Sequence, residues 1–251
     1  MDAFPRALFD ALAPVTIVCG HYGVGKTNFA VNLACDLAHM GKRVTMVDLD
    51  VVNPYFRATE QRSYLEAAGV SIIAPVFAER GSSLDAPSLR GSIVPAMENA
   101  RKDAVGDTYV IVDAGGDDAG VTALGRFAAA IRAGGYAMLY VVNRMRNQTH
   151  EAGEAFRILC EIECASRLEA TAIVDNTHLK NETTSAILAS SSGFCRALCA
   201  ASGLPLAGKT IPASASHEDA INEAVFSAFY GDGFENDIFY PVESIVKSPW
   251  E

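Results

Sequence analysis

Short apolar runs alternate along the chain with longer segments in which apolar residues recur at helical spacing. The runs VTIVC and YVIVDA are almost continuously apolar, which is typical of strands buried on both faces. Strands are predicted at residues 15–19, 43–48, 70–74, 109–113, 136–142, 170–175 and 207–211. The segment 26–40, closed by Gly41, is typical of the helices between them. This alternation predicts an α/β fold, a three-layer sandwich whose mainly parallel central sheet is covered by helices on both faces.

Two segments show neither an apolar strand run nor apolar residues at helical spacing. Residues 75–90 are rich in Gly, Ser, Pro and charged residues, and we expect a long loop there with a functional or mobile role. Residues 230–251 show no strong periodicity and are expected to wrap the surface. Because 50% of the 251 residues are hydrophobic, one large core is expected, and residues 1–251 are predicted to form a single domain.

The stretch CGHYGVGKTNF contains Gly20, four further residues, and then Gly25, Lys26 and Thr27. This spacing matches the phosphate-binding loop G-x-x-x-x-G-K-[ST], and it falls between a predicted strand and a predicted helix. Glycines let backbone N–H groups turn toward phosphate oxygens, the lysine neutralises charge, and the threonine hydroxyl binds Mg²⁺. The alternative is a chance glycine-rich turn. The predicted nucleotide-binding residues of this phosphate loop are Gly20, Gly23, Val24, Gly25, Lys26, Thr27 and Asn28.

Acidic residues follow two further predicted strands, at the end where open α/β sheets bind ligands. Asp48 and Asp50 lie in VDLDVVNPYFR, and two carboxylates near a phosphate site suit Mg²⁺ and an attacking water. In YVIVDAGGDDAG, Asp113 suits a hydrogen bond to a water on Mg²⁺. The Gly116 N–H could bind a γ-phosphate and thereby order the following loop. Each segment could instead be a simple turn, one capping a helix and the other merely acidic.

The order phosphate loop, Asp-x-Asp, Asp-x-x-Gly, each after a strand, resembles the MinD/ParA-like branch of phosphate-loop ATPases, which includes nitrogenase iron protein and metal-insertion ATPases. The resemblance spans most of the chain and is closest in VCGHYGVGKT, VDLDVVNPYF and VDAGGD. It implies a phosphate-loop NTPase with ATP and Mg²⁺ as cofactors. It implies catalytic roles for Lys26 at the phosphates, Asp50 near the attacking water and Asp117 in a second switch segment. The implied Mg²⁺ ligands are Thr27, Asp48, Asp50 and Asp113.

The family resemblance also implies where the base lies. A strand that ends in Asn usually contacts the purine, and AIVDNTHL offers Asn176 with Asp175 beside it. After the last predicted strand, TIPASAS places Pro212 where the family often lines the base pocket. Guanine-specific NTPases hold the guanine N–H groups with a carboxylate three residues after the Asn. This chain has Leu179 there, which favours ATP over GTP.

The phosphate loop departs from these relatives at His21 and Tyr22. In the dimeric members it reads Lys-Gly-Gly-x-Gly-Lys-[ST], and the first lysine crosses to the partner subunit's nucleotide and stabilises charge during hydrolysis. A free imidazole, with a pKa near 6.5, is shorter and mostly neutral at pH 7. Bound phosphate could raise that pKa and restore the charge, or His21 and Tyr22 could merely shape the loop. The second interpretation implies slow turnover, with activation by a partner or a cation such as Arg57 or Arg126.

The cysteines include two pairs at i, i+4 spacing, Cys160 with Cys164 and Cys195 with Cys199. In a helix each pair shares one face, and four such sulfurs could bind a metal. Both pairs continue apolar helical stretches, so all six cysteines are expected to be small core residues without metal.

The formal net charge is −10, from 20 Lys and Arg against 30 Asp and Glu. Because no basic patch is segregated, this charge argues against binding to nucleic acid or anionic lipid. Neither a signal peptide nor a membrane-spanning apolar stretch is found, so a cytoplasmic location with reduced thiols is expected. The histidines His150, His178 and His217 lack ligand spacing and are expected to be solvated.

The leading prediction is an ATP-binding protein whose slow, Mg²⁺-dependent hydrolysis drives a conformational switch, with a possible homodimer and an unidentified client protein. One alternative is an ATP-dependent ligase or transferase of amide-forming or biotin-pathway type, with substrate loops at 82–90 and 180–184. Another is a module that binds nucleotide without turnover, which the missing loop lysine makes credible.

Overall fold

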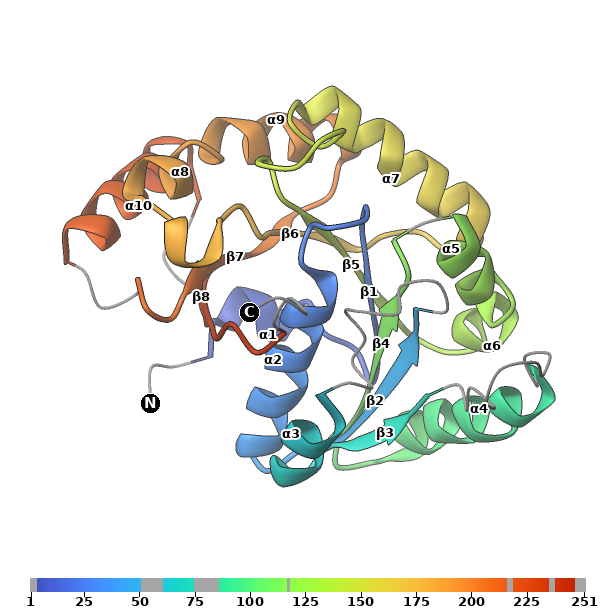
Figure 1. Cartoon of the computed structure of the whole chain (residues 1–251). Helices are drawn as coiled ribbons and strands as arrows, with labels where there is room; N and C mark the ends of the chain where they lie inside the picture. Colours follow the sequence, from blue (N-terminus) through green and yellow to red (C-terminus); the bar gives the residue numbers. More distant parts are fainter. Residues whose placement is uncertain are drawn as a thin grey trace, which may run out of the picture.

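The structure is a computed structural model that describes residues 4–50, 61–74, 86–116, 118–215, 219–234 and 238–246. Eight strands form one sheet in the order β3-β2-β4-β1-β5-β6-β7-β8 (Figure 1). Every pairing in it is parallel. The strands are β1 Val15–Cys19, β2 Arg43–Leu49, β3 Ser71–Ile73, β4 Thr108–Ala114, β5 Ala137–Val142, β6 Ala172–Asp175, β7 Leu206–Pro212 and β8 Phe239–Val242.

Helices cover both faces of this sheet (Figure 1). One face packs against α1 Arg6–Asp10, α2 Lys26–His39 and α3 Arg62–Ala67. The other face packs against α4 Ala86–Lys102, α5 Asp118–Gly125, α6 Ala128–Arg132, α7 Ala152–Ser166, α8 Ser185–Ala189, α9 Ser192–Ser202 and α10 Asp219–Gly231. The expected three-layer α/β sandwich is therefore confirmed.

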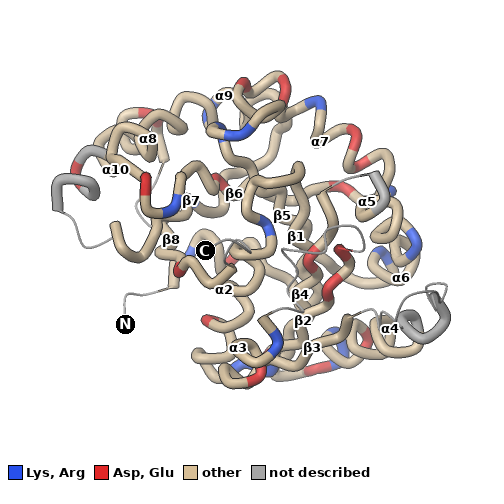
Figure 2. The backbone as a smooth tube through the Cα atoms, viewed as in Figure 1, with Lys and Arg blue, Asp and Glu red and all other residues tan. Residues whose placement is uncertain are grey.

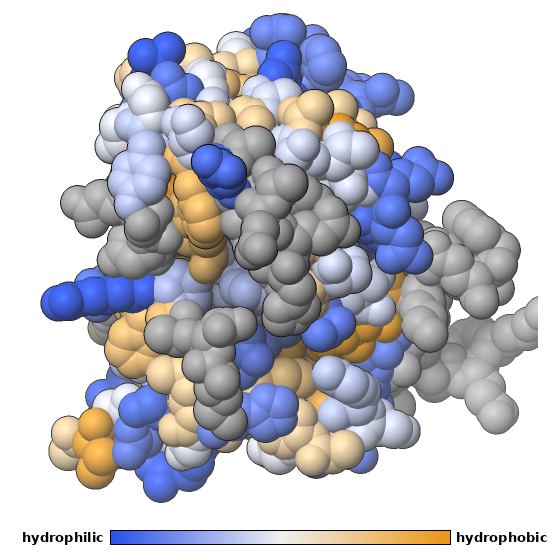
Figure 3. Space-filling view, turned by 90° about the vertical axis from the view of Figure 1, so that its left-hand side faces the viewer, coloured by the Kyte–Doolittle hydropathy of each residue, from blue (hydrophilic) through white to orange (hydrophobic). Residues whose placement is uncertain are grey.

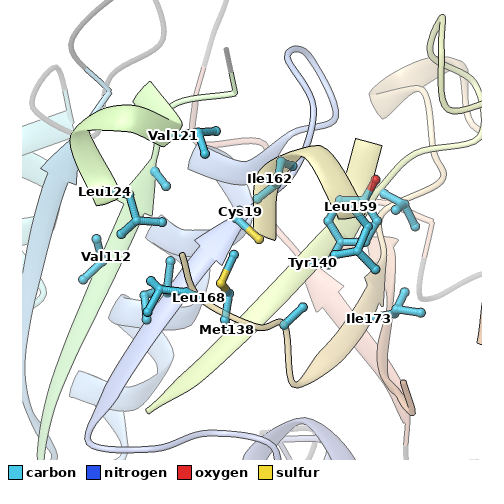
Figure 4. Packing of buried hydrophobic residues seen from close by; sticks show 14 of the residues in the cluster. Cys19, Val112, Val121, Leu124, Met138, Tyr140, Leu159, Ile162, Leu168 and Ile173 are labelled. Carbon is cyan, nitrogen blue, oxygen red and sulfur yellow. The ribbon is translucent and has the colours of Figure 1, made fainter. Parts of the chain in front are cut away.

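The continuous apolar runs form strands because both sides of the central strands are buried. Within β1, Ile17 packs toward the α4–α10 face and Val18 toward the α2 face, and both are fully buried. In β5, Tyr140 lies with Leu159 and Cys19 in the α7 layer (Figure 4). The Tyr140 hydroxyl donates a hydrogen bond of 2.8 Å to the Ala155 carbonyl. A buried phenol therefore satisfies its polar end within the core, as buried tyrosines require.

The seven predicted strands are all present, with bounds that shift by one or two residues. The expectation for the end of the chain was incomplete, because residues 239–242 form an eighth strand, β8. Its Pro241 is tolerated because β8 lies at the edge of the sheet, where a missing N–H breaks no ladder on the outer side. The loop expected at 75–90 lies outside the described residues from 75 to 85, and its last five residues belong instead to α4.

Among the described residues, no helix is both long enough and apolar enough to cross a membrane. On the face turned toward the viewer in Figure 3, hydrophobic residues are interspersed with hydrophilic ones.

Candidate functional site

The phosphate loop connects the end of β1 to the first turn of α2, as predicted. Gly20 and Gly25 have φ angles of 148° and 93°, which side chains rarely adopt. A Cβ atom on Gly20 would lie 2.3 Å from the Val141 carbonyl oxygen, and one on Gly25 would lie 2.3 Å from Asn176 Nδ2. Glycine is therefore required twice, by the backbone conformation and by the close approach of β5 and β6 to the loop.

Lys26 is only 6% exposed and lies inside the curve of this loop. Its Nζ donates a hydrogen bond of 3.1 Å to the His21 carbonyl. Gly116, which follows β4, also lies against this ammonium, because a Cβ atom there would be 2.5 Å from Nζ. The same atom would be 2.7 Å from the Tyr22 nitrogen. The structure thus brings the phosphate loop, its lysine and the Asp-x-x-Gly segment together.

Three acidic residues lie at or just past the neighbouring carboxyl ends of β2 and β4, where the tube in Figure 2 is red. Asp48 and Asp113 are opposite each other in the β2–β4 register, and Val18 of β1 is opposite Asp113 on the other side. Asp48 and Asp113 are fully buried, and Asp50 is 7% exposed. The Asp50 N–H donates a hydrogen bond of 3.0 Å to Asp48 Oδ1. The strands therefore gather the three predicted carboxylates at one point of the sheet.

The pKa of Asp113 is strongly raised. Burial, and then the negative charge of Asp48, raise its pKa to about 8, although Lys26 acts in the opposite direction. Neither of its carboxylate oxygens has a hydrogen-bond partner of ordinary length among the described residues, although the Thr27 hydroxyl lies close enough to lower the Asp113 pKa in part. A buried acceptor without a partner is costly, and a cation or its water would satisfy it.

These residues fit an Mg²⁺ ion whose ligands come partly from the protein and partly from phosphates and water. The described residues contain no group of three or more His, Cys, Asp or Glu side chains that could hold a metal ion. Mg²⁺ typically keeps several waters and is held by one or two carboxylates together with substrate phosphates. The orphaned oxygens of Asp113, with Asp48 and Thr27 nearby in the fold, fit such a partial ligand set. Asp117, expected to be catalytic, lies outside the described residues.

A pocket of about 210 Å³ opens beside the loop, on the β5–β8 side. It contains both residues predicted for the base site, Asn176 and Pro212. It also contains Gly23, Val24, Gly25 and Asn28 of the phosphate loop and first turn of α2. The remaining lining residues are Asn143, Arg146, His178, Lys180, Asn181, Ala213, Ser214, Val242, Glu243 and Ser244. The predicted phosphate and base residues therefore share one continuous site.

Several of these lining residues were missed by the sequence analysis. Asn143 directly follows a predicted strand, so the family rule that pointed to Asn176 would also have pointed to it. Arg146 comes four residues after that strand, and no sequence signal singled it out. His178 was expected to be solvated, but it is 9% exposed and lies in the pocket wall. The contribution of residues 242–244 depends on β8, which the sequence pattern does not indicate.

The Asn176 amide fastens β6 to the phosphate loop. Its Nδ2 donates a hydrogen bond of 2.7 Å to the Val24 carbonyl. Its Oδ1 accepts a hydrogen bond of 2.6 Å from the Thr210 hydroxyl and lies 3.1 Å from His178 Nε2. Because His178 Nδ1 accepts from the Lys180 N–H, Nε2 must carry the proton and donate to Asn176. Burial, and then the positive charge of Lys209, lower the pKa of His178 to about 4, which keeps this neutral tautomer.

A buried ion pair lies below this wall. Lys209 of β7 and Asp175 of β6 are both fully buried, and Nζ is 2.9 Å from Oδ2. Burial alone would raise the pKa of Asp175, but the Lys209 charge and the Ser191 hydroxyl outweigh burial and lower it. Lys209 Nζ also donates a hydrogen bond of 3.1 Å to the Thr177 carbonyl. The pair thus ties β6, β7 and the backbone next to Asn176 together.

The two departures in the loop differ in exposure. The pKa of His21 is lowered, first by burial and then by the charge of Lys26, so the imidazole stays neutral near pH 7. Tyr22 is 55% exposed. Of the alternative cations, Arg126 is exposed, and Arg57 lies outside the described residues.

The expectation for the cysteines was partly wrong. Cys160 and Cys164 are exposed on α7, because the helix buries the face that carries Leu159 and Ile162 instead. Cys19, Cys35 and Cys195 are buried, and Cys199 is half-buried. His150 is exposed as expected, and its Nδ1 lies 3.0 Å from the Arg144 carbonyl. His217 lies outside the described residues.

A parallel sheet with a glycine-rich strand–loop–helix turn, a buried lysine and carboxylates on the adjoining strand ends defines a phosphate-loop nucleotide-binding protein. The family model "CobQ/CobB/MinD/ParA nucleotide binding domain" matches residues 15–181, which is more than half of the chain. The chain belongs to this family and is a nucleotide-binding domain of MinD/ParA type.

Solved structures of similar fold include proteins of the signal recognition particle system. The signal recognition particle receptor FtsY from Elizabethkingia anophelis in complex with GDP has 19% identity and a TM-score of 0.50 over 76% of this chain. The 54 kDa signal recognition particle protein from Aeropyrum pernix K1, also with GDP, has 18% identity and a TM-score of 0.52 over 78%. The chain spans 55% and 40% of the lengths of these two proteins. At this identity the likeness shows the fold alone.

Proposed function

We propose that the chain binds ATP with Mg²⁺ and hydrolyses it slowly, and that the nucleotide switches the conformation of the Asp-x-x-Gly segment. The observation that carries this proposal is the position of the Lys26 ammonium. It lies between the phosphate-loop carbonyl of His21 and Gly116, at the carboxyl end of the strands that carry the three carboxylates. A phosphate that engages this ammonium would meet both the loop and the segment after β4.

In this proposal the backbone N–H groups of the phosphate loop hold the phosphates, and Lys26 neutralises their charge. Thr27 would bind Mg²⁺ directly, with Asp48 and Asp113 holding its waters, and Mg²⁺ would neutralise charge between the β- and γ-phosphates. Asp50 would orient the attacking water. The Gly116 N–H would bind the γ-phosphate and lose that partner after hydrolysis, which gives the switch its nucleotide dependence.

The test is ATP affinity measured by calorimetry in the presence of Mg²⁺. Lys26→Ala should weaken binding by about 1.5–3 kcal/mol, roughly 10- to 160-fold, because a charged hydrogen bond to phosphate is lost. Lys102→Ala is a matched control, since Lys102 is an exposed lysine at the end of α4 whose ammonium pairs with Glu98. Equal affinity of the Lys26→Ala variant and the wild type would overturn the site.

ATP is proposed over GTP because the loop after Asn176 offers Thr177, His178 and Leu179 where a guanine-reading carboxylate is expected. Among the described residues that line the pocket, the one carboxylate is that of Glu243, which comes from the end of the chain. Competition between ATP and GTP should therefore favour ATP. Tighter binding of GTP than of ATP would contradict the proposal. If the Glu243→Gln variant then lost this preference for GTP, Glu243 would be the guanine-reading group.

Two partner proposals accompany this function. A second copy of the chain and an unidentified client protein are proposed as the groups that respond to the switch. They are supported by the exposed Tyr22 at the tip of the phosphate loop, next to Gly116.

A further inference from the structure

The segment after β8 crosses α2 at its first two turns, where the red end of the chain lies over the blue helix in Figure 1. We call residues 242–246 the tail segment. Val242, Glu243 and Ser244 of this segment line the proposed nucleotide pocket, together with Asn176 and His178, which follow β6. The pocket therefore has a wall that comes from the end of the chain, outside the residues 15–181 that match the family.

Two asparagines of α2 hold the tail segment in place. Asn28 Nδ2 donates to the Glu243 carbonyl at 2.9 Å, and its Oδ1 accepts from the N–H groups of Ile245 and Val246 at 3.0 and 3.1 Å. Asn32 Nδ2 donates to the same carbonyl at 3.0 Å, and its Oδ1 accepts from the Glu243 N–H at 2.8 Å. Two side-chain amides thus make five hydrogen bonds to the backbone of residues 243–246, which follow Val242, the last residue of β8.

Asn28 and Asn32 lie on one side of α2, and a third polar residue follows them there at the same spacing. Asp36, one turn after Asn32, accepts a hydrogen bond of 2.5 Å from the Tyr240 hydroxyl of β8. On the opposite side, Lys180 Nζ donates to the Val246 carbonyl at 3.2 Å. Lys180 follows Asn176 and His178 along the chain and lines the pocket as well. The tail segment consequently bridges the phosphate-loop helix and the β6 side of the pocket.

We propose that the tail segment is the outer wall of the base and ribose site and that Asn32 is a positioning residue for it. Asn28 immediately follows Thr27, and Asn32 lies one turn further along the same helix. The helix that begins at the phosphates therefore also fixes the wall for the base. Attachment of the tail segment and binding of the nucleoside part of ATP then strengthen each other by the same factor. This inference rests on the proposed nucleotide function.

Asn32 gives the sharper test because it does not line the pocket, whereas Asn28 does. Asn32 Nδ2 also donates a hydrogen bond of 2.8 Å to the Asn28 carbonyl within α2. A loss through the phosphate-loop helix would therefore appear with tripolyphosphate as well, whereas a loss confined to ATP points to the tail segment. Affinity for ATP should fall about tenfold in this variant, within the 5- to 150-fold range of coupled sites. Affinity for inorganic tripolyphosphate should stay at the wild-type level, since that probe has no base or ribose. Tyr240→Phe is the matched control, because it removes the hydrogen bond of the same strand to Asp36 but leaves the five asparagine bonds intact.

Hydrogen exchange on the wild-type chain supplies a second, independent measurement. The amides of Glu243, Ile245 and Val246 are bonded to the two asparagines, and ATP should slow their exchange while tripolyphosphate should not. Unchanged exchange with ATP would overturn the coupling even if the Asn32→Ala variant failed to fold. Equal ATP affinity in Asn32→Ala and wild type would also overturn it, and so would an equal loss for ATP and tripolyphosphate. Failure of the wild type to bind either ligand would instead overturn the nucleotide function itself, together with this inference.

Discussion

His21 shows how a local charge decides the role of a loop residue. Its imidazole is half-buried, and burial and the neighbouring Lys26 both disfavour its protonated form. A short, neutral side chain cannot supply the positive charge that the first loop lysine of the dimeric relatives brings to the partner subunit's nucleotide. The structure therefore favours the interpretation in which His21 shapes the loop, with its carbonyl as the partner of Lys26.

The first prediction follows from this neutral state. His21→Asn should leave the pH dependence of phosphate release unchanged between pH 5.5 and 8.5, a range that brackets the ordinary histidine pKa of about 6.5. An imidazolium with a catalytic role would instead give a rate that falls as pH rises through its pKa, and this fall would vanish in the variant. Phosphate release measured across that range for both proteins decides between the two.

A second prediction concerns His178 and the pH dependence of stability. Its folded-state pKa is about 4, below the ordinary value of 6.5. Between pH 4 and pH 6.5, the imidazole therefore binds a proton in the unfolded chain but stays neutral in the folded chain. Stability is full above pH 6.5 and falls as pH drops toward 4, by roughly 2 kcal/mol between pH 6.5 and 5.

The matched variant for that measurement is His178→Gln, which keeps a donor and an acceptor but does not titrate. Urea unfolding at pH 7 and at pH 5 should show a smaller loss for the variant than for the wild type. Equal losses would mean that His178 is protonated as easily in the folded chain as in the unfolded one.

The elements show which features could be predicted from the sequence. Strand β1 and helix α2 were predicted within a residue or two, because continuous apolar runs and a glycine stop are local signals. The carboxylates were predicted as site residues because the ends of parallel strands meet at one edge of a sheet, whereas Asn176 was expected only from the family resemblance. Strand β8 was not, since four residues with a proline at a sheet edge leave no periodic pattern.

Helix faces were less predictable than strand ends. Cys160 and Cys164 follow an apolar pattern, but neighbouring residues of α7 fill the core and leave these two cysteines exposed. The stripe of Asn28, Asn32 and Asp36 is visible in the sequence as three polar residues at i, i+4 and i+8. Its meaning depends on a segment more than 200 residues away.

A third prediction tests the ion pair between β6 and β7. Lys209→Met should lower the free energy of unfolding by about 3–5 kcal/mol, because it leaves the buried charge of Asp175 without its partner. The double variant Lys209→Met/Asp175→Asn should regain much of that loss, since neither charge remains. Arg62→Ala breaks an exposed pair with Glu66 and should cost at most about 1 kcal/mol. Urea unfolding followed by circular dichroism measures all three, and a loss for Lys209→Met no larger than for Arg62→Ala would contradict the prediction.

On the scale of the whole molecule, the site lies where strands, loop and tail converge. Strand β1 is central, with β4 and its acidic end on one side and β5 and the pocket on the other. In the proposed function, the acidic strand ends on the β4 side would serve Mg²⁺ and the phosphates, and the pocket on the β5 side would hold the base.

The last prediction concerns turnover by the whole molecule. Lys26 is the cation proposed to meet the phosphates, and His21, whose carbonyl accepts from it, is neutral. Transition-state charge in phosphoryl transfer usually needs a further cation, supplied in cis or by a partner. The lone chain should therefore hydrolyse ATP far more slowly than typical enzymes, whose median rate is about 10 s⁻¹.

If a second copy supplies the cation, the rate per chain should rise with protein concentration, and Arg126→Ala should abolish that rise if Arg126 is the group concerned. If the client protein supplies the cation, the rate per chain should not change with protein concentration. It should also be equally slow in the wild type and in the Arg126→Ala variant. A rate near 10 s⁻¹ that does not depend on concentration would contradict slow turnover, because the chain would then contain a complete catalytic site.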